Sequence, residues 1–257
     1  MANITPRKRF GQNFLKNPHV VEHIIALIAP KKLDHVVEIG PGLGALTSLL
    51  LPLVAKLDAI EIDRDLIPQL HQHCDKLGNL RIHEADALQF DFAQLAGDEK
   101  IRLVGNLPYN ISTPLLFHVL EYRQVIQDMH FMLQKEVVDR MVAQPGNKQY
   151  GRLSVMVQYY CRVEKLIKVK PSAFFPPPKV DSAIVRLVPN AQTSAKDDKQ
   201  LSMMVKRAFQ QRRKTLANNL KGLITADQLL SIDIDPKRRP EQLSVNDYVK
   251  ISNELVR

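Results

Sequence analysis

The first 190 residues alternate between short apolar runs and amphipathic stretches. The apolar runs predict strands at His35–Ile39, Ala55–Ile62, Leu80–His83, Ile101–Gly105 and Asp128–Leu133. The amphipathic stretches predict helices at Asn17–Ala29 (with Asn17 as N-cap), Leu43–Pro52, Asp65–Lys76, Ser112–Arg123 and Lys135–Ala143. Strands that alternate with helices form a parallel sheet covered on both faces, so we expect a doubly wound α/β domain.

The pattern changes towards the C-terminus. Two late strands, Lys165–Val169 and Ala183–Val188, are expected to finish the sheet as an antiparallel hairpin, with Phe174–Pro178 in a loop between them. Further along, apolar residues within Leu201–Leu220 recur at the spacing of one long amphipathic helix. The expected organisation is an α/β domain over residues 1–189, a polar linker over 190–199 and a small all-helical domain over 200–257.

The chain carries a net charge of +9, which is concentrated at its two ends. Residues 1–20 have four basic side chains and no acid, residues 190–257 have 13 basic against 8 acidic side chains, and the middle is neutral. Two basic ends suit a polyanion such as nucleic acid, although a solubilising basic surface gives the same balance. The two cysteines are too few for a disulfide framework, and no apolar run is of transmembrane or signal-peptide type. We expect a cytoplasmic protein with no membrane partner.

A glycine-rich loop follows the first predicted strand, in the segment VVEIGPGLGALT of residues 36–47. Glycines here allow a tight turn and a close approach of a nucleotide-type cofactor to the backbone. Near the ends of the next two strands, Glu61 stands where a carboxylate accepts ribose hydroxyls, and Asp86 where one accepts an adenine amine. The spacing within Gly40–Ala45 also fits the looser dinucleotide pattern, which keeps an NAD-dependent enzyme open. The tight glycine spacing after Glu38 favours a methyl-donor loop instead.

The sequence Asn106-Leu107-Pro108-Tyr109 combines an amide, a stiffening proline and an aromatic ring. An adenine amine is a poor nucleophile because its lone pair is delocalised, and the base must leave its stack to be reached. We expect the Asn106 side-chain oxygen and the Leu107 carbonyl to accept hydrogen bonds from the amine and free its lone pair. Pro108 would fix the turn and Tyr109 would stack on the base. The motif indicates methyl transfer to the exocyclic amine of a nucleobase.

A second aromatic side chain is expected to hold the base from its other face. Phe174, at the start of a proline-rich segment, is the candidate, although packing in the core explains a phenylalanine there equally well. His71, His73 and Cys74 are of metal-ligand type, but helical spacing puts His73 on a different face from Cys74 and no second cluster completes a site. We therefore expect no metal.

Four segments together resemble the ribosomal RNA adenine dimethyltransferases over nearly the whole chain. They are Arg9–Leu15 (RFGQNFL), Glu38–Gly44 (EIGPGLG), Asn106–Tyr109 (NLPY) and Phe174–Ser182 (F-x-P-x-P-x-V-x-S). The resemblance implies a Rossmann-like fold, S-adenosylmethionine as donor and two methyl groups placed on an adenosine amine. It also implies that the donor is held by Asn13, Leu15, Gly40, Glu61 and Asp86, with Asn106 between donor and target.

Within that family, the segment Gln210–Leu216 (QQRRKTL) is similar to the small-subunit enzymes. Those enzymes dimethylate two adjacent adenosines in a hairpin loop near the 3′ end of the RNA, which implies a pre-ribosomal small subunit as the partner. Three alternatives stay open: a large-subunit methyltransferase of the resistance type, a DNA adenine methyltransferase, and a mainly non-catalytic assembly factor. No exposed apolar stripe stands out in the sequence, so we expect a monomer.

Clustered basic side chains are the expected RNA contacts. Consecutive cations on the expected long helix spread over more than half of its surface and suit several phosphates of a folded RNA. The candidates are Arg7, Lys8 and Arg9 in an N-terminal arm, Arg212, Arg213 and Lys214 on the helix, and Lys237, Arg238 and Arg239 beyond it. We expect the C-terminal clusters to dock the ribosomal particle while the first domain performs the chemistry.

Overall fold

The computed structural model describes residue 7 and residues 11–97 and 99–256. These residues form two compact units. The first consists of the described residues up to Val138 together with Glu164–Pro189, and the second of Asp139–Val163 together with the described residues from Asn190 onwards. The structural division differs from the sequence-based one because Asp139–Val163 packs with the C-terminal helices. No helix among the described residues has both the length and the apolar character that a membrane span requires.

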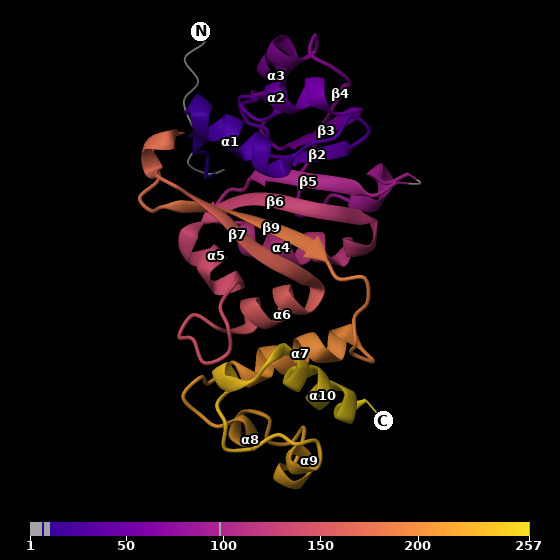
Figure 1. Ribbon diagram of the computed structural model, residues 1–257, viewed down its shortest axis with the longest axis vertical. Coiled ribbons are helices and arrows are strands. Elements are labelled where there is room, and N and C mark those ends of the chain that lie inside the picture. The colour runs from indigo at the N-terminus through magenta and orange to yellow at the C-terminus, as the bar shows by residue number, and fades with distance from the viewer. Residues whose placement is uncertain (1–6, 8–10, 98, 257) are drawn as a thin grey trace. The chain divides into compact units, whose positions relative to one another are not determined.

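Seven strands of the described chain form one mixed sheet in the order β4-β3-β2-β5-β6-β9-β7 (Figure 1). They are β2 (His35–Ile39), β3 (Lys56–Glu61), β4 (Leu80–Glu84), β5 (Ile101–Asn106), β6 (Ile126–Gln134), β7 (Cys161–Val169) and β9 (Ser182–Pro189). The pairs from β4 through β6 are parallel, and β9 runs antiparallel to β6. The predicted parallel sheet with two late strands at one edge is confirmed, and β7 begins four residues before its predicted start.

Helices cover both faces of this sheet. In the first unit they are α1 (Pro18–Ile28), α2 (Thr47–Leu50), η2 (Leu51–Leu53), α3 (Ile67–Cys74), η3 (Phe92–Leu95), α4 (Ser112–Glu121), η4 (Arg123–Val125) and η5 (Pro171–Ala173). Asn17 caps α1 as predicted, since its side chain accepts a hydrogen bond from Val20 N at 3.2 Å. Buried side chains of α1, α2 and α3 share one core cluster with Val36 and Val104. Residues that alternate to the other face, such as Leu103 and Phe131, are buried as well.

The strand order reverses between β2 and β5, and this reversal determines where a ligand can bind. From β2 the chain proceeds to β3 on one side, whereas from β5 it proceeds to β6 on the other. Right-handed crossovers then place α2 and α3 on one face and α4 on the opposite face. The loops that follow β2 and β5 therefore separate at the carboxyl edge of the sheet, where doubly wound folds bind their ligands.

Two further strands pair outside the main sheet. They are β1 (Phe14–Leu15) and β8 (Phe174–Phe175), which pair antiparallel with Phe14 opposite Phe175 and Leu15 opposite Phe174. The sequence analysis placed Phe174 and Phe175 in a loop, so this prediction was wrong. A two-residue strand has no periodicity of its own, and its pairing depends on a segment about 160 residues away.

The second unit is built from helices. They are α6 (Arg152–Tyr160), α7 (Asp198–Ala208), α8 (Leu216–Asn219), α9 (Ala226–Ser231), η6 (Pro240–Gln242) and α10 (Val245–Leu255), and α5 (Lys135–Met141) leads into the unit. An aromatic cluster lies in its core, where the Phe209 ring centroid is 6.4 Å from that of Tyr150 and 5.8 Å from that of Tyr248. The Tyr248 hydroxyl donates to the Pro240 carbonyl at 2.7 Å.

The long helix predicted within Leu201–Leu220 is broken in the structure, so that prediction was wrong. α7 ends at Ala208 and α8 begins only at Leu216. The Asn219 side-chain amide donates to the carbonyls of Gln211, Lys214 and Thr215 at 3.1–3.3 Å. Those carbonyls are thus satisfied outside a helix, and a compact turn replaces the helix that the apolar spacing predicts.

Candidate active site

A cavity of about 270 Å³ opens at the carboxyl ends of β2, β3, β4 and β5. Its walls are the glycine loop after β2, the loops after β3 and β4, the segment Gly11–Leu15, and Asn106–Ile111 after β5. The structure brings together all predicted donor and motif residues except Phe174, namely Asn13, Leu15, Gly40, Glu61, Asp86, Asn106, Leu107, Pro108 and Tyr109. Their assignments to donor and target remain predictions, but they share one cavity.

The glycine loop combines an open position with a closely packed one. Gly40 has a φ of +68°, and a β-carbon added to it would meet no atom within 4 Å. Gly42 has a φ of +59°, and a β-carbon there would lie 3.1 Å from the Phe14 ring. Both residues need the left-handed conformation that glycine adopts at low cost. The open space beside Gly40 lets a ligand approach the backbone, while Gly42 holds the loop against β1.

Glu61 ends β3 with its carboxylate held by backbone donors. Gly42 N donates to Oε2 at 3.2 Å and Asp63 N donates to Oε1 at 2.9 Å. Each carboxylate oxygen has a second lone pair, so both can still accept hydrogen bonds from a pair of hydroxyls. Burial raises the pKa of Glu61, partly offset by these backbone hydrogen bonds. This geometry fits the predicted ribose contact.

Asp86 is held by a local turn after β4. Leu88 N donates to its Oδ1 at 2.9 Å, and the Gln89 amide donates to its Oδ2 at 3.4 Å. Apolar side chains of Ile62 and Ala87 line the cavity beside it. An apolar surface next to a carboxylate suits a flat heterocycle that carries an amine, as predicted for the donor's adenine.

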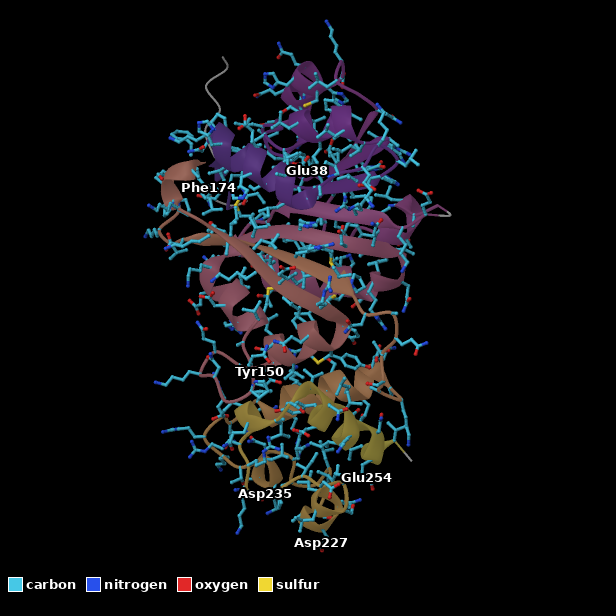
Figure 2. All side chains as sticks on the ribbon, in the orientation of Figure 1. Glu38, Tyr150, Phe174, Asp227, Asp235 and Glu254 are labelled. Carbon is cyan, nitrogen blue, oxygen red and sulfur yellow. The ribbon has the colours of Figure 1, made fainter. Side chains whose placement is uncertain are left out.

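Glu38 is a second buried acid in the cavity wall, and Figure 2 shows it inside the sheet region. It is 2% exposed and accepts a hydrogen bond from Thr47 Oγ1 at 2.6 Å. Burial raises the pKa of Glu38 to about 7; the Thr47 hydrogen bond opposes the rise and the Glu61 charge adds to it. The sequence singled out Glu38 only as part of the glycine motif. Its position on a buried strand was the signal that could have identified it as a titrating group.

We expect Glu38→Gln to change how stability depends on pH. The native pKa of Glu38, about 7, lies above the unfolded value of 4.5, so the folded state holds a proton that the unfolded chain releases. Its stabilising contribution is complete below pH 4.5 and is lost as pH rises through 7. Between pH 5 and 8 the unfolding free energy of the wild type should fall by about 2.5 kcal/mol relative to Glu38→Gln.

Urea unfolding at several pH values measures this difference. Glu121→Gln, an exposed change on α4, is the matched control and should run parallel to the wild type. Parallel curves for the wild type and Glu38→Gln would show that Glu38 is ionised throughout.

Asn106 stands at the end of β5 with its amide orientation fixed. Its Nδ2 donates to the Asn13 carbonyl at 2.8 Å, which leaves Oδ1 as the acceptor towards the cavity. Leu107 N donates to the Met132 carbonyl at 3.1 Å. No donor among the described residues contacts the Leu107 carbonyl. Both oxygens thus retain acceptor capacity, and their contact with the target amine stays a prediction.

Gly105 explains how the motif reaches this position. A β-carbon there would lie 2.5 Å from the Ile39 carbonyl oxygen and 3.1 Å from Leu107 Cδ2. A larger residue would push β5 away from β2 and move Asn106 with it. The close packing of these two strands therefore depends on a glycine that the sequence analysis assigned only to the strand.

Tyr109 is anchored by the far end of the proline-rich segment. Its hydroxyl lies 2.6 Å from Ser182 Oγ, and Ser112 Oγ donates to its carbonyl at 3.1 Å. Burial raises the pKa of Tyr109, and the Ser182 hydrogen bond acts in the opposite direction. Ser182 had no predicted role, although it belongs to the motif that begins at Phe174. The structure shows that these two motifs meet through this contact.

A model of the ribosomal RNA adenine dimethylase family matches residues 3–257. The chain belongs to this family. It is 55% identical over 251 residues, 97% of this chain and 91% of the relative, to ribosomal RNA small subunit methyltransferase A of Marinobacter nauticus. It is 54% identical over 252 residues, 97% of this chain and 94% of the relative, to the protein of that name in Pseudomonas aeruginosa. A crystal structure of a dimethyladenosine transferase from Plasmodium falciparum has a TM-score of 0.83 at 32% identity and covers 93% of this chain and 95% of that one.

Phe174, which was predicted to hold the target base of this adenine dimethylase, does not lie in the cavity. Phe174 is 0% exposed, belongs to the core cluster and does not line the cavity, and Figure 2 labels it on the proline-rich segment. Its neighbour Phe175 is 54% exposed. In this structure Phe174 therefore packs in the core, which is one of the two alternatives that the sequence left open.

Arg7, a predicted RNA contact, is bound to acids beside the cavity of this dimethylase. Its guanidinium lies 2.9 Å from Asp63 Oδ1 and also contacts Asp65. Gln12 Nε2 donates to Asp63 Oδ2 at 2.8 Å and connects the same acid to the cavity wall. Arg7 is thus paired with acids beside the cavity, while Lys8 and Arg9 lie outside the described residues.

Both C-terminal basic clusters of the dimethylase lie outside helices, which corrects the predicted helical position of Arg212, Arg213 and Lys214. Arg212 donates to the carbonyls of Lys148 and Tyr150, each at 2.9 Å, and Arg238 bonds to Asp247 and the Gln242 carbonyl. These two arginines therefore stabilise the second unit. Arg213, Lys214, Lys237 and Arg239 are exposed, and so is Arg212 despite its hydrogen bonds. Leu216 N donates to the Arg238 carbonyl at 2.8 Å, so the two basic turns are neighbours.

His71, His73 and Cys74, which have the side-chain types of metal ligands but were not predicted to bind a metal, have other surroundings in this dimethylase. No group of three or more histidine, cysteine or acidic side chains in the described part of the chain has an arrangement that could hold a metal ion. His71 pairs instead with Asp75 at 2.8 Å. Burial raises the pKa of the Cys74 thiol to about 11, which disfavours the thiolate that binds metals.

Proposed function

We propose that this chain transfers methyl groups from S-adenosylmethionine to the 6-amino groups of two adjacent adenosines in a hairpin loop near the 3′ end of small-subunit ribosomal RNA, as part of ribosome assembly. The observation that carries the proposal is that Asn106 lines the same cavity as the glycine loop, with its Nδ2 engaged by the Asn13 carbonyl and its Oδ1 left as an acceptor. Family membership and 55% identity to a small-subunit methyltransferase support the choice of RNA.

The cavity fits the donor by its chemistry. Gly40 leaves open space beside the backbone, Glu61 can accept from a ribose, and Asp86 can accept from an adenine amine. We propose that Asn13 and Leu15 hold the amino-acid end of the donor. The bound sulfonium supplies an already activated methyl group, so the protein needs no metal to assist the transfer.

The motif residues act on the target amine. Asn106 Oδ1 and the Leu107 carbonyl accept its two hydrogens, which favours a pyramidal nitrogen with a localised lone pair. Tyr109, held by Ser182, provides a face for the extruded base. The proton leaves after the nitrogen has become cationic, so the mechanism requires positioning more than a strong base.

Docking on the ribosomal particle is proposed for the exposed cations of the second unit. Arg213, Lys214, Lys237 and Arg239 are free to face phosphates, whereas Arg212 and Arg238 bond within the unit. Phosphate contacts position a protein on RNA and make its affinity fall with salt.

The test incubates the protein with labelled S-adenosylmethionine and undermethylated small subunits, and analyses the RNA as nucleosides. We expect labelled N6,N6-dimethyladenosine from the 3′ hairpin and none from large subunits treated in parallel. Label in large-subunit RNA alone would support the resistance-type alternative. Tight binding to small subunits without any transfer would support a non-catalytic assembly role and overturn the proposal.

A further inference from the structure

The β1–β8 ribbon presents an aromatic ring outwards. The two phenylalanines of β8 point to opposite sides, as successive residues of a strand do. Phe174 is completely buried, whereas Phe175 is 54% exposed. The core position is already filled by Phe174, so Phe175 has no buried site to occupy and its ring remains available on the surface.

The backbone that carries this ring is well held. Lys16 N and Asn17 N both donate to the Ala173 carbonyl, at 2.9 and 3.3 Å. β8 pairs with β1 on one side and continues into Pro176, Pro177 and Pro178 on the other. A ring on a fixed backbone loses little conformational freedom when another group stacks on it.

Three lysines lie close to Phe175 in the sequence or follow the strand that pairs with β8. Lys16 follows β1, Lys170 precedes η5 and Lys179 follows the proline run, and all three are exposed. Within the described residues none of the three forms an ion pair, whereas nearby Lys168 pairs with Asp181 at 2.8 Å. The ribbon therefore combines a bare aromatic surface with unneutralised positive charge.

The ribbon also adjoins the transfer site. Phe14 and Leu15 of β1 line the cavity, and Phe175 is the register partner of Phe14. At the other end of the same segment, Ser182 holds Tyr109. Phe175 is therefore joined to the wall of the cavity that contains Asn106 through its partner Phe14.

We propose that Phe175, flanked by Lys16, Lys170 and Lys179, is a second RNA-binding point that stacks an unpaired base next to the target adenosine. The inference rests on the proposed function and extends it to a neighbouring nucleotide. Proteins recognise single-stranded RNA by stacking bases on aromatic rings while cations contact the phosphates. A purely apolar partner would leave the three charges unmatched, and a purely anionic surface would leave the ring unused.

Phe175→Ala should weaken binding to undermethylated small subunits by about 5- to 100-fold, since one base–aromatic stack contributes on that scale. Phe175→Trp should bind as the wild type does, and the affinity for S-adenosylmethionine should be unchanged in both. The matched control is Leu33→Ala, which removes another exposed apolar side chain of the same unit (77% exposed). Replacing the three lysines by glutamine should lower the slope of log Kd against log salt by about 2.

Stacking of a base on residue 175 can be measured directly by tryptophan fluorescence, because the chain contains no tryptophan. The F175W variant has a single indole, whose emission should be quenched by protein-free small-subunit RNA, while an L33W variant should show no change. Unquenched emission from bound F175W, or wild-type affinity of F175A, would overturn the inference, as would equal quenching by anionic lipid vesicles. Methyl transfer by the wild type is assayed with the same subunits. No transfer would overturn the proposed function. If transfer occurs, a negative binding or fluorescence result overturns only the inference about Phe175.

Discussion

Asn106→Ala is expected to slow methyl transfer by about a thousandfold while changing donor affinity less than tenfold. The side chain is positioned by its 2.8 Å hydrogen bond to the Asn13 carbonyl, and its oxygen remains as an acceptor on a residue of the cavity wall. Alanine removes the acceptor that favours a reactive amine but leaves the glycine loop, Glu61 and Asp86 in place. Single-turnover transfer rates and donor titrations measure the two quantities separately.

Two further variants separate the role of the Asn106 oxygen as a hydrogen-bond acceptor from the role of Asn13 in positioning the donor. Asn106→Asp retains an oxygen but cannot donate to the Asn13 carbonyl, so both the rate and the donor affinity should fall. Asn13→Ala removes a side chain yet keeps the carbonyl that Asn106 contacts. It should weaken donor binding more than it slows transfer. Equal rates for Asn106→Ala and the wild type would exclude Asn106 from the chemistry.

The sequence predicted the cavity well because parallel strands end at the same edge of a sheet. Gly40, Glu61, Asp86 and Asn106 follow four different predicted strands, and the structure places all four in one cavity wall. The strands before Gly40, Glu61 and Asn106 were identified from apolar runs that are largely buried, and β4 from the shorter, half-buried run at Leu80–His83. Whether these four residues meet in one cavity therefore depends only on the order and direction of the strands. Simple topology rules allow few such orders and directions.

Features that depend on one distant contact were not predictable in the same way. Phe174 and Phe175 are chemically identical, and only pairing with β1 decides which of them is buried. Arg7 was expected to face RNA, but Asp63 and Asp65 neutralise it across more than 50 residues of sequence. The Asn219 amide likewise breaks the expected long helix by binding carbonyls of the preceding turn. None of these partners can be chosen from local periodicity.

Arg102 was assigned to a strand, and a buried charge network was not expected there. The guanidinium is 5% exposed and bonds to both Asp128 oxygens at 2.8 and 2.9 Å. It also contacts Asp34 at 2.6 Å and the Ile28 carbonyl at the end of α1 at 2.6 Å. One side chain thus connects β5 with β6, with the start of β2 and with the C-terminal end of α1.

Arg102→Met is expected to lower the unfolding free energy by about 3–5 kcal/mol. Methionine fills much of the space, but Asp128 and Asp34 lose their main cation and the Ile28 carbonyl loses its donor. A loss of this size is a large share of the roughly 5–15 kcal/mol that stabilises a typical protein. Urea unfolding at pH 7 and 25 °C measures the change, and Arg102→Lys should lie between Arg102→Met and the wild type because it keeps the charge but not the two-pronged contact.

A double-mutant cycle separates the ion pair from the volume of the side chain. Asp128→Asn removes the acid, so Arg102→Met combined with Asp128→Asn should cost less than the sum of the single changes. Strict additivity would mean that the two groups do not stabilise the fold through each other. The network lies at the opposite end of β5 from Asn106, so the folded fraction of Arg102→Met should bind the donor with wild-type affinity at low temperature. Stability and chemistry are then separable along a single strand: its first residues hold the sheet to α1, and its last residue presents the acceptor to the target amine.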